Sequence, residues 1–256
     1  MNIIILAAGR GERLMPLTQN TPKPLIDMGN GNTLLEQQML SIQQSGAIKE
    51  ATLVVGYLAE QIEAKMRAYR ARGFHVHTLY NPFWQQSNNL MSLWLARQVL
   101  EQGDVMITNG DNIFTPDVFA GLAEQGEGIW LSACEKTEFD SDDMKVTLKD
   151  GLVARVAKTI PAEEASVESP GLVMVKGARA RELFIEQLEG AARDDGSMNR
   201  FWLEVFNRMW TKGVPVKPWI FESAGRWQEI DFHIDVQHVR QLLHEKLLNL
   251  HSGDKE

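Results

Sequence analysis

The feature that most constrains the fold is an alternation of short apolar runs with helical patterns over roughly the first 110 residues. Residues 3–7 form an unbroken aliphatic run, which is typical of a strand buried on both faces. The same patterns predict strands at 52–55, 74–79 and 104–108, and helices at 33–44, 59–70 and 89–100. Strands that alternate with helices are joined by right-handed crossovers. The predicted fold class is therefore α/β, with a Rossmann-like, doubly wound sheet that is mixed but mostly parallel.

The pattern changes beyond Cys134. A hairpin is predicted there, because two apolar segments flank the turn residues Lys149-Asp150-Gly151. We further predict an apolar strand at 172–175, helices at 179–189 and 199–211, an edge strand at 214–220 that contains proline, and an amphipathic helix at 235–250. No linker divides the chain. We expect a single domain, 1–256, with a core of about 1–134 and 226–256 and a small mixed-sheet insertion, about 135–225, over the active-site edge.

Composition excludes several classes of function. The 256 residues carry a net charge of −8, so the chain lacks the basic face of a nucleic-acid-binding protein. A single cysteine allows no intrachain disulfide and favours a reducing compartment. No apolar segment approaches the roughly 18 residues that a membrane span requires, and no basic region precedes the first apolar run. We expect a cytoplasmic protein without membrane insertion or nucleic-acid partners.

A glycine-rich loop follows the first predicted strand. It reads Leu6-Ala7-Ala8-Gly9-Arg10-Gly11-Glu12-Arg13-Leu14-Met15-Pro16-Leu17-Thr18, and Thr21-Pro22-Lys23-Pro24-Leu25 comes next. Such a turn lets backbone N–H groups approach phosphate oxygens, and Arg13 and Lys23 add positive charge beside them. The third glycine of the dinucleotide fingerprint is missing, because Leu14 stands in its place, and a Walker A lysine is absent.

The whole string, residues 3–26, resembles the signature L-A-A-G-x-G-x-R-L-x-P-L-T, followed by P-K-P-L, of the nucleotide-diphospho-sugar pyrophosphorylase superfamily. Members of this nucleotidyltransferase superfamily transfer a nucleotidyl group from a nucleoside triphosphate to a phosphomonoester and release pyrophosphate. The resemblance implies that Lys23 contacts the α-phosphate and that Arg13 and Gly11 contact the triphosphate. It also implies that a short stretch at the end of the first strand contacts the nucleotide: Leu6, Ala7, Ala8 and Gly9.

Two aspartates are candidates for a metal site. Asp111 follows the predicted strand 104–108, at the edge where doubly wound sheets bind ligands, and carboxylate oxygens suit Mg²⁺. The string Trp227-Gln228-Glu229-Ile230-Asp231 resembles the family's W-x-E-I-D, whose aspartate completes the Mg²⁺ site. The resemblance therefore implies that Asp111 and Asp231 share a Mg²⁺ ion. Taken alone, an aspartate that ends a strand, as Asp111 does, is more often a turn residue or a helix cap.

A fourth string narrows the resemblance. Asn88-Asn89-Leu90-Met91-Ser92-Leu93-Trp94-Leu95 is similar to the N-N-x-x-S-L-x-L of the phosphocholine cytidylyltransferase branch. Asn88, Asn89 and Ser92 are therefore candidates for nucleotide binding, and side-chain amides could read the edge of cytosine. Capping of the next helix is an alternative and compatible role. Residues 142–146 also look like this branch, so Lys145 is a candidate for the acceptor's phosphate, with an exposed hairpin lysine as the alternative.

The acceptor pocket is the least determined part. Trp202, Phe206 and Trp210 recur at helical spacing, which is more typical of a core face than of a ligand box. A quaternary ammonium would nonetheless require aromatic faces and a nearby acid, such as Glu168 or Glu204. The sequence does not show whether these side chains meet.

The expected function is transfer of CMP from CTP to a small phosphomonoester or phosphonate, with Mg²⁺ as cofactor and release of pyrophosphate. Phosphocholine, phosphoethanolamine and 2-aminoethylphosphonate are the leading acceptors. One alternative is a sugar-1-phosphate nucleotidyltransferase that uses UTP or dTTP. Another is a non-catalytic nucleotide-sensing subunit on the same fold. The sequence leaves the acceptor, the oligomeric state and the packing of the C-terminal helix open, and a homodimer is compatible with it.

Overall fold

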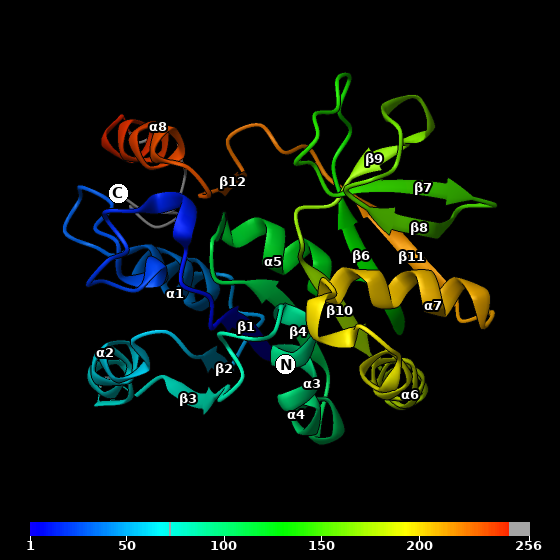
Figure 1. Ribbon diagram of the computed structural model, residues 1–256, viewed down its shortest axis with the longest axis horizontal. Coiled ribbons are helices and arrows are strands. Elements are labelled where there is room, and N and C mark those ends of the chain that lie inside the picture. Colours follow the sequence, from blue (N-terminus) through cyan, green and yellow to red (C-terminus); the bar gives the residue numbers. More distant parts are fainter. Residues whose placement is uncertain (72, 246–256) are drawn as a thin grey trace.

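A seven-stranded sheet forms the centre of the computed structural model, which describes residues 1–71 and 73–245 (Figure 1). Its strands lie in the order β11-β6-β10-β4-β1-β2-β3. Their bounds are β1 Asn2–Ala7, β2 Glu50–Val55, β3 His75–Tyr80, β4 Val105–Asn109, β6 Gly128–Ala133, β10 Val173–Lys176 and β11 Val216–Ile220. Only β10 runs antiparallel to its neighbours, β4 and β6, whereas the other pairs are parallel. The predicted mostly parallel α/β sheet is confirmed.

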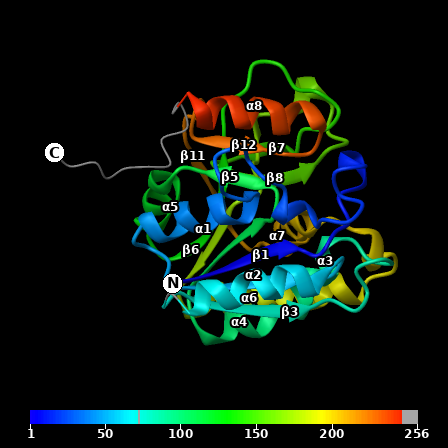
Figure 2. The same cartoon turned by 90° about the vertical axis from the view of Figure 1, so that its left-hand side faces the viewer.

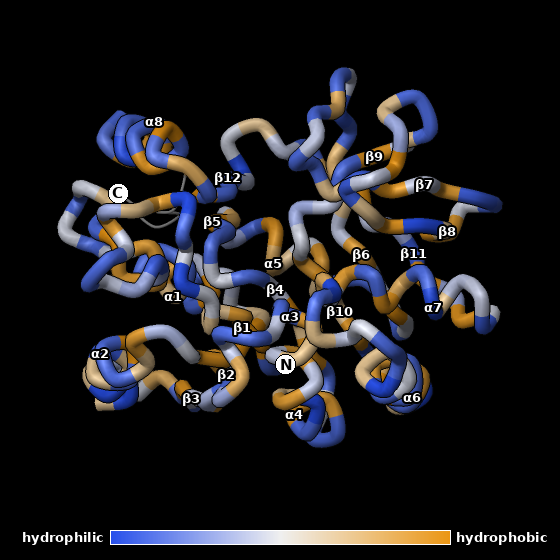
Figure 3. Tube along the Cα trace, viewed as in Figure 1, coloured by the Kyte–Doolittle hydropathy of each residue, from blue (hydrophilic) through white to orange (hydrophobic). Residues whose placement is uncertain are grey.

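Strand β1 is central because its side chains are apolar on both faces. Ile3 and Ile5 pack into one core cluster and Ile4 into another, and none of the three is exposed to solvent. Alternate side chains of a strand point to opposite faces, so each face needs its own cover of helices. In Figure 3 the central strands are mainly hydrophobic, while hydrophilic residues recur on the outer turns of α2, α6 and α8.

Helices cover both faces. Their bounds are α1 Leu34–Gln44, α2 Ala59–Ala71, α3 Asn89–Leu95, α4 Arg97–Gln102, α5 Pro116–Ala123, α6 Ala178–Arg193, α7 Val205–Thr211 and α8 His233–His244. Side chains of α1, α2 and α5 pack with Ile3 and Ile5, and those of α3, α4, α6 and α7 pack with Ile4. Helix α1 begins with a capping box in which Thr33 and Glu36 bond each other's backbone N–H groups.

Two predicted helices differ from the structure. The helix expected over 89–100 is divided at Ala96, whose backbone leaves the helical region with φ −85° and ψ 4°. The helix expected over 199–211 begins only at Val205. The reason for the late start lies in tertiary contacts, since the Trp202 backbone N–H donates to the Asn89 side chain at 2.9 Å rather than to a preceding carbonyl.

A small antiparallel sheet contains the predicted hairpin. It consists of β7 Lys145–Lys149, β8 Leu152–Ala157 and β9 Val167–Glu168, and the connecting turn places Asp150 and Gly151 at φ 52° and 76°. Strands β10 and β11, which fall within the expected insertion 135–225, belong to the main sheet. Strand β11 contains Pro218 and lies at the sheet edge, as predicted.

A third, two-stranded sheet joins β5 Asn112–Phe114 to β12 Trp227–Glu229. Helix α8 lies beside β12 in both views (Figure 2). Val236 and Val239 of α8 pack with Leu14 and Ile26, so this helix covers the loops that follow β1. The predicted helix 235–250 extends past the described residues, and Leu247 lies outside them. No helix among the described residues is long and apolar enough to cross a membrane.

Candidate active site

A cavity of about 450 Å³ opens at the carboxyl ends of β1 and β4. Twelve of the thirteen residues proposed from the sequence line it, and only Lys145 does not. These lining residues are Leu6, Ala7, Ala8, Gly9, Gly11, Arg13, Lys23, Asn88, Asn89, Ser92, Asp111 and Asp231. Segments far apart in the sequence therefore meet at one edge of the sheet, where doubly wound folds bind ligands.

The glycine-rich loop leaves β1 and turns back against Lys23. Gly11 has a left-handed backbone with φ 68°, and a Cβ there would lie 3.1 Å from the Cβ of Lys23. The Thr18 hydroxyl donates to the Gly11 carbonyl at 2.8 Å, which holds this conformation. At Gly9 a Cβ would meet no atom within 4 Å, so the loop backbone is open to the cavity there. The sequence thus forms a loop that a ligand can approach closely.

Three carboxylates gather on one side of the cavity: Asp111, Glu229 and Asp231, whose ligand oxygens all lie within 4.8 Å of one another. Asp111 lies in the short turn between β4 and β5, and the pairing of β12 with β5 brings the other two beside it. The Ile230 N–H donates to the Asp111 carbonyl at 3.0 Å, which fixes the two segments together. Glu229 belongs to the string Trp227–Asp231, but the sequence pattern predicts no role for it.

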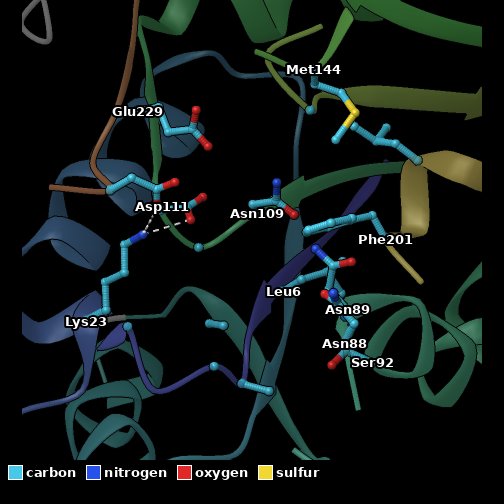
Figure 4. Close-up of a pocket in the computed structure, with 18 of the residues that line it drawn as sticks. Leu6, Lys23, Asn88, Asn89, Ser92, Asn109, Asp111, Met144, Phe201 and Glu229 are labelled. Atoms are coloured by element: carbon cyan, nitrogen blue, oxygen red, sulfur yellow. Dashed lines mark hydrogen bonds and ion pairs between the residues drawn. The ribbon is translucent and has the colours of Figure 1, made fainter. Parts of the chain in front are cut away.

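Lys23 lies between two of these carboxylates (Figure 4). Its Nζ is 2.9 Å from an Asp111 oxygen and 2.6 Å from an Asp231 oxygen. Burial on its own would lower the pKa of Lys23, but attraction to Asp111 and Asp231 outweighs it and raises the pKa. Lys23 is therefore an ammonium group held at the acidic cluster.

At Glu229, burial and the neighbouring charges shift the pKa in the same direction. Burial by the surrounding protein, followed by the charges of Asp111 and Asp231, raises its pKa to about 8. The residue nevertheless keeps an open face toward the cavity. The charges around Glu229 are therefore mainly negative.

The acidic cluster fits a divalent cation. Three carboxylates against one ammonium leave a formal excess of two negative charges when all are ionised. Carboxylate oxygens are hard ligands of the kind that Mg²⁺ binds. The residues present could thus hold such an ion, with Asp111, Glu229 and Asp231 as its ligands.

Arg13 links the loop to two other parts of the chain. Its Nη1 lies 2.9 Å from Asp231 and 3.0 Å from Asp142, and Asp142 in turn lies 2.7 Å from the Nζ of Lys158. The hydrogen bond from Lys158 is the first cause of a lowered pKa at Asp142. The sequence pattern predicted no role for either residue, although Asp142 belongs to the segment 142–146 that resembles the phosphocholine branch. The ion-pair chain joins the first loop, the small sheet and the segment before α8.

Lys145 is placed differently from the prediction. Its side chain is buried, and its Nζ donates to the Lys158 carbonyl at 2.9 Å. It therefore binds the backbone after β8 and does not reach the cavity, whereas the Lys158 side chain does. The expected contact between Lys145 and the acceptor's phosphate is not supported by this placement.

Asn88 and Asn89 connect α3 with residues 198–202. The Asn88 side chain accepts a hydrogen bond from the Asn89 N–H at 2.8 Å, and the Asn88 backbone N–H donates to the Met198 carbonyl at 2.6 Å. Asn88 is thus the N-cap of α3, which the sequence had offered as a compatible role. Ser92 accepts a hydrogen bond from Asn81 at 3.0 Å. All three candidate residues face the cavity (Figure 4).

The aromatic stripe belongs mainly to the core. Trp202 and Phe206 are buried and their rings contact each other edge to face, while Trp210 is half-buried. Among the described residues, the aromatic side chains that line the cavity are Trp84 and Phe201. The aromatic stripe is therefore part of the hydrophobic core, as its helical spacing predicted.

Of the two acids considered for the acceptor, Glu168 lines this cavity and Glu204 does not. Glu168 is 8% exposed and ends β9. Its placement makes it the candidate that the structure retains.

Gln38 supports the loop that carries Asp111. Its side-chain amide donates to the Asn109 carbonyl at 3.0 Å and to the Asn112 carbonyl at 2.5 Å. Gln38 is 2% exposed, so water competes little for these bonds. The sequence contained no signal for this role, because a glutamine inside a helix is ordinary.

Comparison with known proteins identifies the family. A 2-aminoethylphosphonate cytidylyltransferase of Lancefieldella rimae is 32% identical over 217 residues, which cover 80% of this chain and 79% of that protein. The model of the nucleotidyl transferase family matches residues 2–127. The chain belongs to the nucleotidyl transferase family.

Other relatives of this nucleotidyltransferase agree with the resemblance seen in the sequence. A choline-phosphate cytidylyltransferase of Streptococcus pneumoniae is 35% identical over 119 residues, 46% of this chain and 48% of that protein. The structure of a CTP:phosphocholine cytidylyltransferase from S. pneumoniae shares the fold, with a TM-score of 0.76, 23% identity and coverage of 94% and 98% of the two chains. The predicted family and enzyme class are confirmed. These relatives do not favour the sugar-1-phosphate or the non-catalytic alternative.

Proposed function

We propose that this nucleotidyltransferase transfers CMP from CTP to a small phosphomonoester or phosphonate and releases pyrophosphate. The observation that carries the proposal is the convergence, in one cavity, of the glycine-rich loop, Lys23 and the acidic cluster of Asp111, Glu229 and Asp231. The cytidylyltransferase relatives support CTP as the donor. A cytoplasmic location and a homodimer stay predictions.

Transfer to a phosphate acceptor does not require a general base. An acceptor phosphate has a second pKa of about 6 and is largely dianionic at neutral pH, so its oxygen is already a nucleophile. The main barrier is repulsion between this dianion and the triphosphate. Catalysis therefore requires positioning and positive charge at the α-phosphate.

Positively charged side chains of this chain are placed for that task. Lys23 would bind the α-phosphate oxygens, on which negative charge grows in the transition state. Arg13 and the backbone N–H groups of the loop at Gly9 and Gly11 would hold the β- and γ-phosphates. Nη1 of Arg13 is paired with Asp142 and Asp231, so a bound phosphate would compete with these two carboxylates for that nitrogen.

The acidic cluster would hold Mg²⁺ through Asp111, Asp231 and Glu229. When bound, this ion supplies charge neutralisation for phosphate oxygens. Asn88, Asn89 and Ser92 would lie at the base, where side-chain amides can match the hydrogen-bonding edge of cytosine.

A pyrophosphate-release assay tests the proposal. CTP, UTP, ATP and GTP are each paired with phosphocholine, phosphoethanolamine, 2-aminoethylphosphonate and a sugar 1-phosphate, with Mg²⁺ present. We expect turnover with CTP and at least one of the three non-sugar acceptors. Turnover confined to UTP and the sugar phosphate would overturn the proposal in favour of the first alternative. Absence of turnover in a folded enzyme would favour the second.

A further inference from the structure

The cavity has a second side, away from the acidic cluster. In Figure 4 Met144 and Phe201 lie apart from Lys23 and Asp111, and Asn109 lies between the two groups. Glu168 belongs to the Met144 side, because the Ser169 N–H that follows it donates to the Met144 carbonyl at 2.9 Å. A bound acceptor whose phosphate approaches the α-phosphate held at Lys23 would extend toward this side.

Glu168 shares a single ammonium with another carboxylate. The Nζ of Lys136 lies 2.7 Å from an Asp143 oxygen and 3.3 Å from a Glu168 oxygen, so Asp143 is the nearer partner. Two carboxylates and one ammonium leave one negative charge in excess when all are ionised. Burial is the first cause of a raised pKa at Glu168, to about 7, and the Asp143 charge adds to it against the opposing effect of Lys136. A cationic ligand would supply the missing positive charge.

The chemistry of the lining distinguishes two kinds of cation. A quaternary ammonium has no N–H donor and is bound chiefly by several aromatic faces. A primary ammonium has three donors and is bound by oxygen acceptors. Among the described residues that line the cavity, the aromatic ones are Trp84 and Phe201.

Both aromatic rings already have neighbours. The Trp84 ring packs on Tyr57 with centroids 5.4 Å apart, and the Lys158 Nζ lies 5.8 Å from the Phe201 centroid. One ring that faces a lysine does not make an aromatic cage. The buried carboxylate of Glu168 suits a hydrogen-bonding cation, whereas Asp142, which also lines the cavity, is already paired with Arg13 and Lys158.

We propose that Glu168 accepts hydrogen bonds from the acceptor's ammonium group, and that the acceptor is a zwitterion in which a primary amine is joined to a phosphate or phosphonate. This inference rests on the proposed function and adds the substrate class and the residue that selects it.

The test compares three acceptors that differ only in the group at the far end: phosphoethanolamine, phosphocholine and 2-hydroxyethyl phosphate, each with CTP and Mg²⁺. We expect wild-type kcat/KM to be about tenfold or more higher for phosphoethanolamine than for the other two, since only its nitrogen is both charged and able to donate. Glu168→Gln should lower kcat/KM for phosphoethanolamine about 10- to 100-fold, mainly through KM. The same variant should leave 2-hydroxyethyl phosphate and the KM for CTP nearly unchanged.

Glu164→Gln is the matched control, because Glu164 is an exposed carboxylate just before β9 and does not line the cavity. It should match the wild type with every acceptor. Equal wild-type kcat/KM for phosphoethanolamine and phosphocholine would overturn the inference, whether or not Glu168→Gln folds. An equal loss by Glu168→Gln with all three acceptors would also overturn it, because that pattern indicates a structural role. If the wild type transferred CMP from CTP neither to these three acceptors nor to 2-aminoethylphosphonate, the proposed function itself would fail.

Discussion

The ammonium of Lys23 lies 2.6 Å from a carboxylate oxygen of Asp231, a residue 208 positions later in the chain. The same ammonium is 2.9 Å from Asp111, which follows the central strand β4. One lysine therefore joins the loop after β1, the end of β4 and the segment before α8. This lysine partly neutralises the acidic cluster.

Asp111→Asn should lower kcat by about 10² or more, because a neutral amide replaces an anionic ligand at the proposed metal site. The variant should also bind Mn²⁺ more weakly in calorimetry without CTP, which measures the site independently of turnover. Full activity at saturating Mg²⁺ together with unchanged Mn²⁺ affinity would contradict the assignment.

Lys23→Ala should lower kcat far more than it raises the KM for CTP, since the ammonium is expected to act on charge that develops in the transition state. Lys23→Arg should restore little activity, because a planar guanidinium does not replace a compact ammonium between Asp111 and Asp231. The measurement is the kcat and the KM for CTP of both variants under steady-state conditions. A change in KM alone would show that Lys23 binds ground state and transition state equally.

The same Lys23→Ala variant should melt at a lower temperature than the wild type in EDTA. Its carboxylates lose their shared cation, and a partly buried charge without a partner is destabilising. Added Mg²⁺ should raise the melting temperature of the variant more than that of the wild type, because a ligand that binds only the folded state stabilises it. If Mg²⁺ raised the melting temperature of both proteins equally, the ion would bind at a site other than the acidic cluster.

Selection of the base is testable in the wild type. Cytosine and uracil present opposite hydrogen-bonding groups at position 4 and at N3, so a matched site leaves polar groups unpaired with the wrong base. We expect kcat/KM for CTP to exceed that for UTP by about 10² or more. Comparable values for the two nucleotides would remove the proposed role of the segment at Asn88 and Asn89.

Gln38→Leu should reduce activity although Gln38 does not line the cavity. The substitution keeps the approximate volume but leaves two carbonyls next to Asp111 without their donor, which costs about 1–3 kcal/mol of unfolding free energy. We expect kcat to fall about tenfold as the Asp111 loop loosens. Ser41→Ala is the control, since Ser41 lies one turn further along α1 and bonds the Phe114 carbonyl beyond this loop. An equal kcat loss in both variants would indicate a general effect of α1.

The thiol of Cys134 should not react with Ellman's reagent in the native protein near neutral pH. Cys134 is 1% exposed, and burial followed by the charge of Glu168 raises its pKa to about 12, so the reactive thiolate is scarce. Full reaction is expected after unfolding in guanidinium chloride. Rapid labelling of the folded enzyme would show that the backbone bridge between Cys134 and Glu168 opens readily.

Local sequence patterns predicted most of the strands and helices of the fold. The apolar run at the start of the chain predicts the central strand β1, because a strand with no polar face must be buried on both sides. Pro218 likewise marks the edge strand β11, since proline cannot donate to a ladder. The string from Leu6 to Leu25 predicted the loop that lines the cavity, because its glycines and its lysine belong to one contiguous stretch of the chain.

Helix ends and long-range contacts depended on the tertiary structure. The late start of α7 follows from a bond between Trp202 and Asn89, two residues that no local pattern relates.

The sequence by itself therefore determined the family, the sheet and the two aspartates of the candidate site, since each rests on a contiguous string. Only the tertiary structure decided which neighbouring side chains join them. It places Lys158 in the cavity instead of Lys145, adds Glu229 to the acidic cluster and puts Glu168 at the far side. The physical reason is that strand pairing and burial set the direction of a side chain, and both depend on segments that are distant along the chain.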